Sequence, residues 1–167
     1  MYYYYKYNGN RKGASVESSP EFRIMVKHPT LTFDRTEEMG IGPLMCVYLE
    51  VFTILKRGFN RFFSEIHIMR GSHSCTKAVL VSKVPIYEFM PDHGIHVCFC
   101  RTALEDRGKG YYPTLLKFIL EKYPQKDFYM IVEDTNIARI RGIEKVGFTR
   151  YAIGEKVGKT FKVLHYV

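Results

Sequence analysis

Tryptophan is absent from the sequence, and only four cysteines occur among its 167 residues. They are Cys46, Cys75, Cys98 and Cys100, and they form neither a Cys-x-x-Cys pair nor a zinc-ligand pattern. We therefore predict no bound metal, and we expect reduced, buried thiols in a cytoplasmic protein. Cys98 and Cys100 are predicted to share one face of a strand and to line the core.

Long hydrophobic runs and long basic runs are also missing. The best membrane candidate, Ile41–Leu55, is too short to cross a bilayer and contains Glu50. The first residues lack the charged and then apolar pattern of a secretory signal. The net charge is +8 and the pI about 9.3, yet no basic tail exists. We expect an anionic small ligand, and neither a nucleic-acid nor a membrane partner.

The composition is that of a globular protein, with 46% hydrophobic, 25% charged and 15% aromatic residues. We predict a single domain over residues 21–167. Residues 1–20 begin with the low-complexity stretch Tyr2–Tyr7 and are interpreted as a leader. The alternative is that the tyrosines form an added strand or a dimer contact, because tyrosine favours both strands and interfaces.

A glycine-rich turn between a strand and a helix dominates the second half of the chain. Ile95–Thr102 is predicted to be a strand, Arg107–Tyr112 a turn and Pro113–Glu121 a helix. Such a turn directs backbone N–H groups and the helix dipole at one point, and its glycines allow close approach of a ligand. We interpret it as a pyrophosphate cradle. The spacing of a nucleotide-binding P-loop is absent, and so is the third glycine of a dinucleotide fingerprint.

The remaining elements are predicted from periodicity and turn signals. Downstream of the cradle we expect a strand over Phe128–Val132, a helix that begins after Asn136 and ends at Gly147-Phe148, and a hairpin. The hairpin strands are Arg150–Lys156 and Thr160–Val167. The earlier part is predicted to hold three strand regions and one apolar helix, namely Glu21–Lys27, Phe62–Met69, Lys77–Phe89 and Leu44–Lys56.

These motifs resemble the GNAT superfamily of acyl-CoA-dependent N-acyltransferases. The resemblance rests on Arg107-Gly108-Lys109-Gly110 after a strand, then Asn136, then Glu144–Phe148, in the order found in that family. It implies an α+β fold with a mixed, mostly antiparallel central sheet, a splayed parallel strand pair and flanking helices. It also implies acetyl-CoA as cofactor, with its pyrophosphate on the glycine-rich turn.

Two positions depart from the family pattern. Tyr112 stands where the family usually has glycine or alanine, so its side chain must point away from the phosphates or the cradle is altered. Ile143 stands where many members have a tyrosine that protonates the departing thiolate. Tyr111, Tyr112 and Tyr151 are the candidate replacements for that acid.

The resemblance implies a set of cofactor-binding residues on the first strand, the turn and the following helix start. They are Cys100, Arg101, Thr102, Arg107, Gly108, Lys109, Gly110, Tyr111, Tyr112 and Asn136. Asn136 is equally a helix N-cap, because asparagine is among the best capping residues. On the same helix, Arg139 or Arg141 either meets a cofactor phosphate or lies on a solvated face.

Acyl transfer to an amine also needs a base, because the amine must lose a proton before it attacks. The candidates are Glu88, His96 and Glu133. His96 has a suitable intrinsic pKa, and its alternative is a histidine of the core or sheet edge. The alternative for Glu133 is a solvated strand end, and Glu88 is placed on the strand before the central one.

The sequence therefore predicts an acetyl-CoA-dependent N-acetyltransferase that acts on a small-molecule primary amine. An amino sugar or sugar nucleotide is the preferred acceptor by analogy, and a peptide or protein amine is the runner-up. A non-catalytic acyl-CoA-binding module of the same fold is the alternative from another class. The tyrosine-rich start and the apolar helix Leu44–Lys56 suggest a homodimer.

Overall fold

The structure is a computed structural model of the chain, and it describes residues 1–7, 21–27, 51, 63–83 and 87–167. These residues form an 8-stranded sheet in the spatial order β2-β3-β4-β5-β6-β1-β7-β8. The strands are β1 (Tyr2–Tyr7), β2 (Arg23–Lys27), β3 (Phe63–Arg70), β4 (His73–Ser82), β5 (Ile95–Thr102), β6 (Phe128–Glu133), β7 (Thr149–Val157) and β8 (Thr160–Tyr166). The helices are η3 (Leu104–Asp106), α2 (Tyr111–Lys122) and α3 (Ile137–Lys145).

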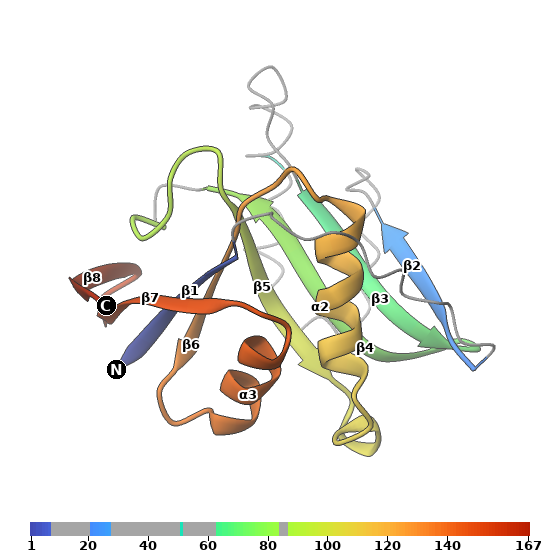
Figure 1. The fold of residues 1–167 in the computed structure, drawn as a ribbon. Helices are drawn as coiled ribbons and strands as arrows, with labels where there is room; N and C mark the ends of the chain where they lie inside the picture. The colour runs from blue at the N-terminus through green and yellow to red at the C-terminus, as the bar shows by residue number, and fades with distance from the viewer. Residues whose placement is uncertain (8–20, 28–50, 52–62, 84–86) are drawn as a thin grey trace.

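The sheet is mixed, and its described neighbours run antiparallel except for one pair. β5 and β6 are parallel, and they pair only through Ile95 with Phe128 and His96 with Tyr129. Beyond these residues the two strands diverge, as Figure 1 shows. The expected fold class, including the splayed parallel pair, is confirmed.

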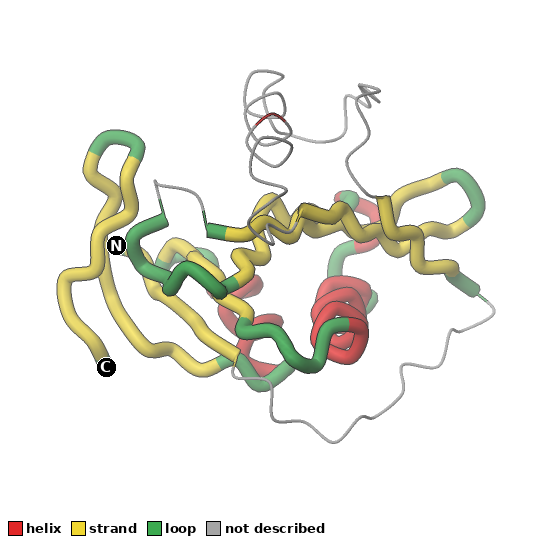
Figure 2. Tube along the Cα trace, turned by 90° about the horizontal axis from the view of Figure 1, so that it is seen from above, coloured by secondary structure: helices red, strands yellow, loops and turns green. Residues whose placement is uncertain are grey.

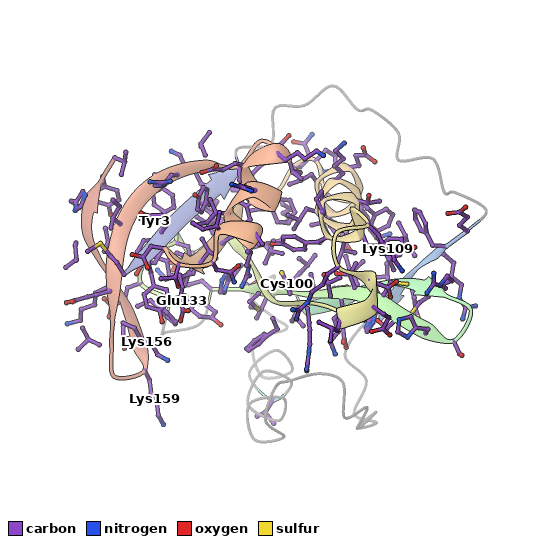
Figure 3. The ribbon with its side chains drawn as sticks, turned by 90° about the horizontal axis from the view of Figure 1, so that it is seen from below. Tyr3, Cys100, Lys109, Glu133, Lys156 and Lys159 are labelled. Carbon is purple, nitrogen blue, oxygen red and sulfur yellow. The ribbon has the colours of Figure 1, made fainter. Side chains whose placement is uncertain are left out.

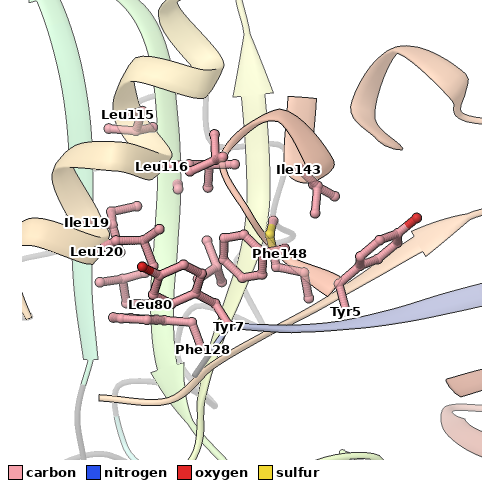
Figure 4. Packing of buried hydrophobic residues seen from close by; sticks show 14 of the residues in the cluster. Tyr5, Tyr7, Leu80, Leu115, Leu116, Ile119, Leu120, Phe128, Ile143 and Phe148 are labelled. Carbon is pink, nitrogen blue, oxygen red and sulfur yellow. The ribbon is translucent and has the colours of Figure 1, made fainter. Parts of the chain in front are cut away.

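Both long helices pack on one face of the sheet, which curves around them (Figure 2). α2 buries Leu115, Leu116, Ile119 and Leu120 in the larger hydrophobic core. These positions recur with the spacing of one helix face, which is why this segment is an amphipathic helix. Figure 4 shows them meeting aromatic side chains from the strands, among them Phe128. Neither helix could cross a membrane by length and hydropathy.

The tyrosine-rich start of the chain is an interior strand, so its interpretation as a leader is wrong for Tyr2–Tyr7. β1 lies between β6 and β7 and pairs with both. Tyr5 and Tyr7 face the helix-side core, and Tyr4 faces a second aromatic core on the opposite face. A strand covered on both faces favours apolar side chains on both, which explains the aromatic run Tyr2–Tyr5 and Tyr7, with Lys6 only half-buried between them. Residues 8–20 lie outside the described residues.

The tyrosine hydroxyls of β1 find polar partners at the edges of the two cores. The Tyr5 hydroxyl donates to Glu144 Oε1 at 2.7 Å, and the Tyr4 hydroxyl donates to the Lys162 carbonyl at 3.0 Å. β1 therefore ties α3 and β8 to the centre of the sheet. The alternative interpretation of these tyrosines, an added strand, is confirmed. The sequence could have indicated a strand covered on both faces, because polar residues do not alternate with the tyrosines.

Three further expectations need correction or fall outside the structure. Cys98 and Cys100 do not share a face, because a bulge in β5 intervenes and Phe99 adopts a φ of 48°. Cys98 joins the second core, whereas Cys100 packs against the helix-side core. Glu88 lies in an exposed turn after β4 rather than on a strand. The predicted helix Leu44–Lys56 lies outside the described residues except for position 51.

Candidate functional site

A cavity of about 600 Å³ opens where β5 leaves β6, between this edge and the starts of α2 and α3. All of the predicted cofactor-binding residues line it except Lys109. The residues that sequence reasoning did not commit to are Asp106, Pro113, Ala138, Arg139, Arg141, Gly142 and Lys145. The lining is rich in basic side chains and holds one carboxylate, Asp106, so the cavity suits an anionic ligand.

The glycine-rich turn forms one wall of the cavity. Gly108 and Gly110 have φ values of 79° and 80°, which side chains with a Cβ rarely adopt. A Cβ built on either glycine would meet nothing within 4 Å, so both face open space. Gly110 is the N-cap of α2, and its carbonyl accepts the first helical hydrogen bond from Thr114 at 3.1 Å. The backbone N–H groups at this helix start remain available for an anion.

A buried carboxylate, Asp106, holds this turn in place through ion pairs. The Asp106 side chain is 0% exposed, and it binds Lys109 Nζ at 3.0 Å and His73 Nε2 at 2.7 Å. Arg70 approaches the same carboxylate at 3.5 Å. Hydrogen bonding from Lys109 and then from His73 lowers the pKa of Asp106 to about 2. Lys109 is thus held by the protein, while Arg107 faces the cavity.

Asp106 also lies close to His73 and Cys75, with potential ligand atoms within 4.8 Å of one another. Two cations, Arg70 and Lys109, already occupy the Asp106 carboxylate. Positive charge at this distance opposes a divalent cation, so we interpret the cluster as an ion-pair network that fixes the turn.

The inner wall of the cavity is built from Tyr112, Arg139, Gly142 and Cys100. A Cβ on Gly142 would lie 2.9 Å from the Tyr112 ring, so the helix approaches this ring closely only because residue 142 is glycine. The Tyr112 hydroxyl and the Arg139 Nε are buried and lack a hydrogen-bond partner among the described residues. Burial, together with the adjacent Cys100, raises the pKa of Tyr112.

The start of α3 closes the cavity on the β6 side. The Asn136 side chain accepts a hydrogen bond from the Arg139 backbone N–H at 3.2 Å, so the expected N-cap is confirmed. Asn136 also lines the cavity, and its two predicted roles are compatible. The helix ends at Lys145 with Val146 as its C-cap, and Gly147, with a φ of 98°, takes the left-handed position that follows.

Comparisons with known proteins address the fold. No protein-family model matches the sequence, and no curated protein matches it. Solved structures do match in three dimensions. A tandem GNAT protein from the clavulanic acid biosynthesis pathway matches with a TM-score of 0.59 and 13% identity, and the match covers 90% of this chain and 50% of that protein. A GNAT-family acetyltransferase from Colwellia psychrerythraea has a TM-score of 0.57, 13% identity, and coverages of 89% and 52%.

A putative acetyltransferase of the GNAT family from Novosphingobium aromaticivorans has a TM-score of 0.50 and 14% identity, with coverages of 90% and 60%. The chain has the GNAT fold. It spans between 50% and 60% of the length of these three structures. At such low identity the likeness concerns the fold alone, and activity has to be argued from the cavity.

Within this GNAT fold, the bulge of β5 lies beside the splayed gap. Ala78 of β4 lies opposite the bulge, since Lys77 pairs with Arg101 and Val79 with Cys98. The extra residue interrupts the ladder between β4 and β5 at the level where β5 has left β6. In Figure 3, Cys100 appears between Lys109, on the glycine-rich turn, and Glu133, at the end of β6. In this view the residue at the bulge thus lies between the glycine-rich turn and the carboxyl end of β6.

The structure places the other two candidate bases, His96 and Glu133, in different surroundings. His96 is 5% exposed, and its ring packs edge-on against Tyr87 and Phe89 at 4.4 and 5.3 Å between centroids. Burial and, after it, the charge of Arg139 lower the pKa of His96 to about 3. Glu133 is exposed at the end of β6.

The structure also distinguishes the candidate acids. Tyr151 packs in the second core, and its hydroxyl donates to the Phe89 carbonyl. Tyr111 and Tyr112 line the cavity. Only these two of the three tyrosines are therefore at the candidate site. The strand–helix pattern could not indicate this, because the difference arises from which side of the sheet each tyrosine faces.

Proposed function

We propose that the protein is an acyl-CoA-dependent N-acyltransferase that transfers an acetyl group to a primary amine. The observation that carries this proposal is the position of the glycine-rich turn at the N-terminus of α2, directly beside the gap between β5 and β6. One wall of a single cavity offers an anion site, and the adjacent strand edge offers unpaired backbone groups. Coenzyme A carries phosphates and a peptide-like arm in that order.

The residues present fit this cofactor. Gly108 and Gly110 leave space that any Cβ would fill, and Arg107 supplies a full positive charge beside it. Coenzyme A, when bound, would supply the activated thioester. Arg107 and the helix start would hold its phosphates. The free edge of β5 near Cys100–Thr102 would accept and donate hydrogen bonds to the amide groups of its arm.

The chain also has groups suited to the steps of transfer. A backbone N–H at the bulge of β5 would stabilise negative charge on the thioester oxygen. Glu133 is the best-placed candidate base, because it stands at the splayed end of β6 on the face opposite the helices. The Tyr2 hydroxyl donates to Glu133 Oε1 at 3.0 Å and restrains its orientation. A primary amine would approach from that face, lose its proton to Glu133 and attack the thioester.

The thiolate that leaves needs a proton or a positive charge nearby. Tyr111 and Tyr112 line the cavity and are the remaining candidates for the acid that Ile143 cannot supply. Burial raises the pKa of Tyr112, so its hydroxyl stays protonated and would stabilise the thiolate by donating a hydrogen bond to it. An amino sugar or sugar nucleotide remains the preferred acceptor, and a peptide amine the runner-up.

The test is calorimetric titration with acetyl-CoA and with coenzyme A. The native chain is compared with Gly110→Trp, and Gly158→Trp is the matched control. Both glycines have positive φ, at 80° and 60°, and both face open space, but Gly158 lies in the β7–β8 turn. We expect micromolar binding to the native chain and the control, and none to Gly110→Trp. Circular dichroism verifies that each variant folds.

Turnover separates catalysis from binding. Free thiol release from acetyl-CoA is measured with amino sugars, sugar nucleotides and peptides as acceptors. Release that depends on an acceptor supports the transferase, whereas tight binding without release with any acceptor supports the non-catalytic module. Absence of coenzyme binding by the native chain would refute both.

A further inference from the structure

The guanidinium of Arg139 is the part of the cavity that the proposed function leaves without a role. Arg139 lines the cavity from α3, and its Nε atom is shielded from solvent without a hydrogen-bond partner among the described residues. The Tyr112 hydroxyl on the same wall is also buried, and it lies close enough to Arg139 and Cys100 to interact with both. Neither the Tyr112 hydroxyl nor the Arg139 Nε has good hydrogen-bond geometry to a described residue, so a ligand in the cavity can add a hydrogen bond to each.

No carboxylate neutralises Arg139 within the described part of the chain. The acidic side chains near the cavity are engaged elsewhere, since Asp106 binds Lys109 and Glu144 binds Tyr5 and Arg150. The groups that interact with the Arg139 charge include Cys100, Tyr112 and Cys98, and burial raises the pKa of each. They are neutral at ordinary pH. The guanidinium of this half-buried arginine, whose Nε is shielded from solvent, therefore has no carboxylate partner among the described residues.

The position of this charge is toward the reacting end of the cavity. The electrostatic influence of Arg139 reaches Cys98 and Cys100, on both sides of the bulge, and also lowers the pKa of His96 after the larger effect of burial. Of these residues, Cys100 lines the cavity together with Arg139, beyond the point where β5 and β6 stop pairing. The phosphate-binding wall at Arg107–Gly110 has its own positive groups.

We propose that Arg139, assisted by the Tyr112 hydroxyl, binds a carboxylate carried by one of the substrates. The inference rests on the proposed function, because it assumes that coenzyme A lies in the same cavity. A planar guanidinium matches the two oxygens of a carboxylate, and a protonated tyrosine donates a further hydrogen bond. The carboxylate belongs either to the far end of a dicarboxylic acyl group or to an amino-acid acceptor.

The gain for the protein is selectivity. A neutral substrate would bind more weakly, because it leaves the guanidinium in the cavity without a carboxylate partner. A substrate with a carboxylate would bind more tightly, because it supplies that partner. Acetyl-CoA would then be bound as a smaller analogue of the true donor, or the amine would carry its carboxylate next to the attacking nitrogen. Gly142 belongs to this arrangement, because it allows Tyr112 to lie where its hydroxyl faces Arg139.

The first experimental arm compares donors by calorimetry. Coenzyme A, acetyl-CoA and succinyl-CoA are titrated into the native chain, Arg139→Gln, Tyr112→Phe and Arg141→Gln. Arg141 is the matched control, since it lies on the same helix and lines the same cavity but is exposed. If the acyl group is the source, native protein prefers succinyl-CoA over acetyl-CoA by roughly tenfold to a hundredfold.

In that case Arg139→Gln removes the preference for succinyl-CoA, Tyr112→Phe reduces it, and Arg141→Gln changes the three affinities in parallel.

The second arm titrates glycine and glycinamide into protein saturated with coenzyme A. A preference for glycine that disappears in Arg139→Gln identifies the acceptor as the source of the carboxylate. Circular dichroism shows whether each variant is folded, and Tyr112→Phe keeps the test valid if Arg139→Gln is not.

Three results would overturn the inference. Equal weakening of coenzyme A, acetyl-CoA and succinyl-CoA by Arg139→Gln would assign Arg139 to the coenzyme phosphates. Unchanged affinities with a uniform fall in kcat would assign it to the leaving thiolate. No preference for a carboxylate in either arm would refute it while coenzyme binding stands. Absence of coenzyme binding by the native chain would instead remove the proposed function itself.

Discussion

Protonation of His96 should destabilise the fold in mildly acidic solution. The side chain is buried against aromatic rings, and its pKa falls from 6.5 to about 3. Between these values the unfolded chain binds a proton at this residue and the folded chain does not. Stability contributed by neutral His96 is therefore present above pH 6.5 and is lost as the pH falls toward about 3.

The magnitude follows from the linkage relation. Between about pH 7.5 and about pH 5, a histidine that titrates at its ordinary pKa only when unfolded lowers the free energy of unfolding by about 2 kcal/mol. His96→Phe removes the titrating group and keeps an aromatic ring beside Tyr87 and Phe89. Between about pH 7.5 and about pH 5, we expect the free energy of unfolding of this variant to fall by about 2 kcal/mol less than that of the native chain.

The assay is urea unfolding at both pH values, followed by far-ultraviolet circular dichroism because the chain has no tryptophan. His165→Phe is the control, since His165 is exposed on β8 and its replacement should leave the native pH dependence unchanged. Equal losses in the native chain and in His96→Phe would refute the reasoning. They would mean that His96 binds a proton in the folded state as readily as in the unfolded chain.

Three further changes test the fold and the turn. Tyr5→Ala should lower the free energy of unfolding by about 3–5 kcal/mol because Tyr5 is 0% exposed in the core, whereas Tyr2→Ala should lower it by about 1 kcal/mol or less. Thermal unfolding measures both losses, and equal losses would contradict the interior placement of β1. Gly142→Ala should lower the free energy of unfolding by about 1–3 kcal/mol, because the added methyl group overpacks against the Tyr112 ring. In the double variant with Tyr112→Ala, this loss should disappear. Asp106→Asn should remove the part of the acid-induced loss of stability that Asp106 contributes as the pH falls from 3.8 through about 2. Acid unfolding measures this, and a variant with the native acid profile would contradict the ion-pair network.

Local patterns were enough to predict the strand, turn and helix around the cavity. The cradle depends on Gly108, Gly110 and a helix start that are contiguous in sequence, so their geometry follows from nearest neighbours. The same holds for the Asn136 cap and for Gly147. The expected cofactor-binding residues come together for that reason, with Lys109 turned instead toward Asp106.

Features that depend on distant pairing could not be predicted in the same way. β1 pairs with β6 and β7, which lie more than a hundred residues along the chain, and no local signal specifies those partners. Alternation along Ile95–Thr102 placed Cys98 and Cys100 together, because a pattern of period two has no means of registering the bulge at Phe99. The burial of Arg139 likewise depends on two helices meeting over a strand.

Tyr112 shows how the two kinds of information combine. In the sequence alone, a bulky residue at the sixth position of the turn suggests an altered or disused cradle. In the fold, the ring packs over Gly142, and the cavity beside Gly108 and Gly110 stays open. A side chain that only blocked the site would need neither a compensating glycine nor a buried arginine beside its hydroxyl. The arrangement therefore favours a change in what the cavity binds over a loss of binding.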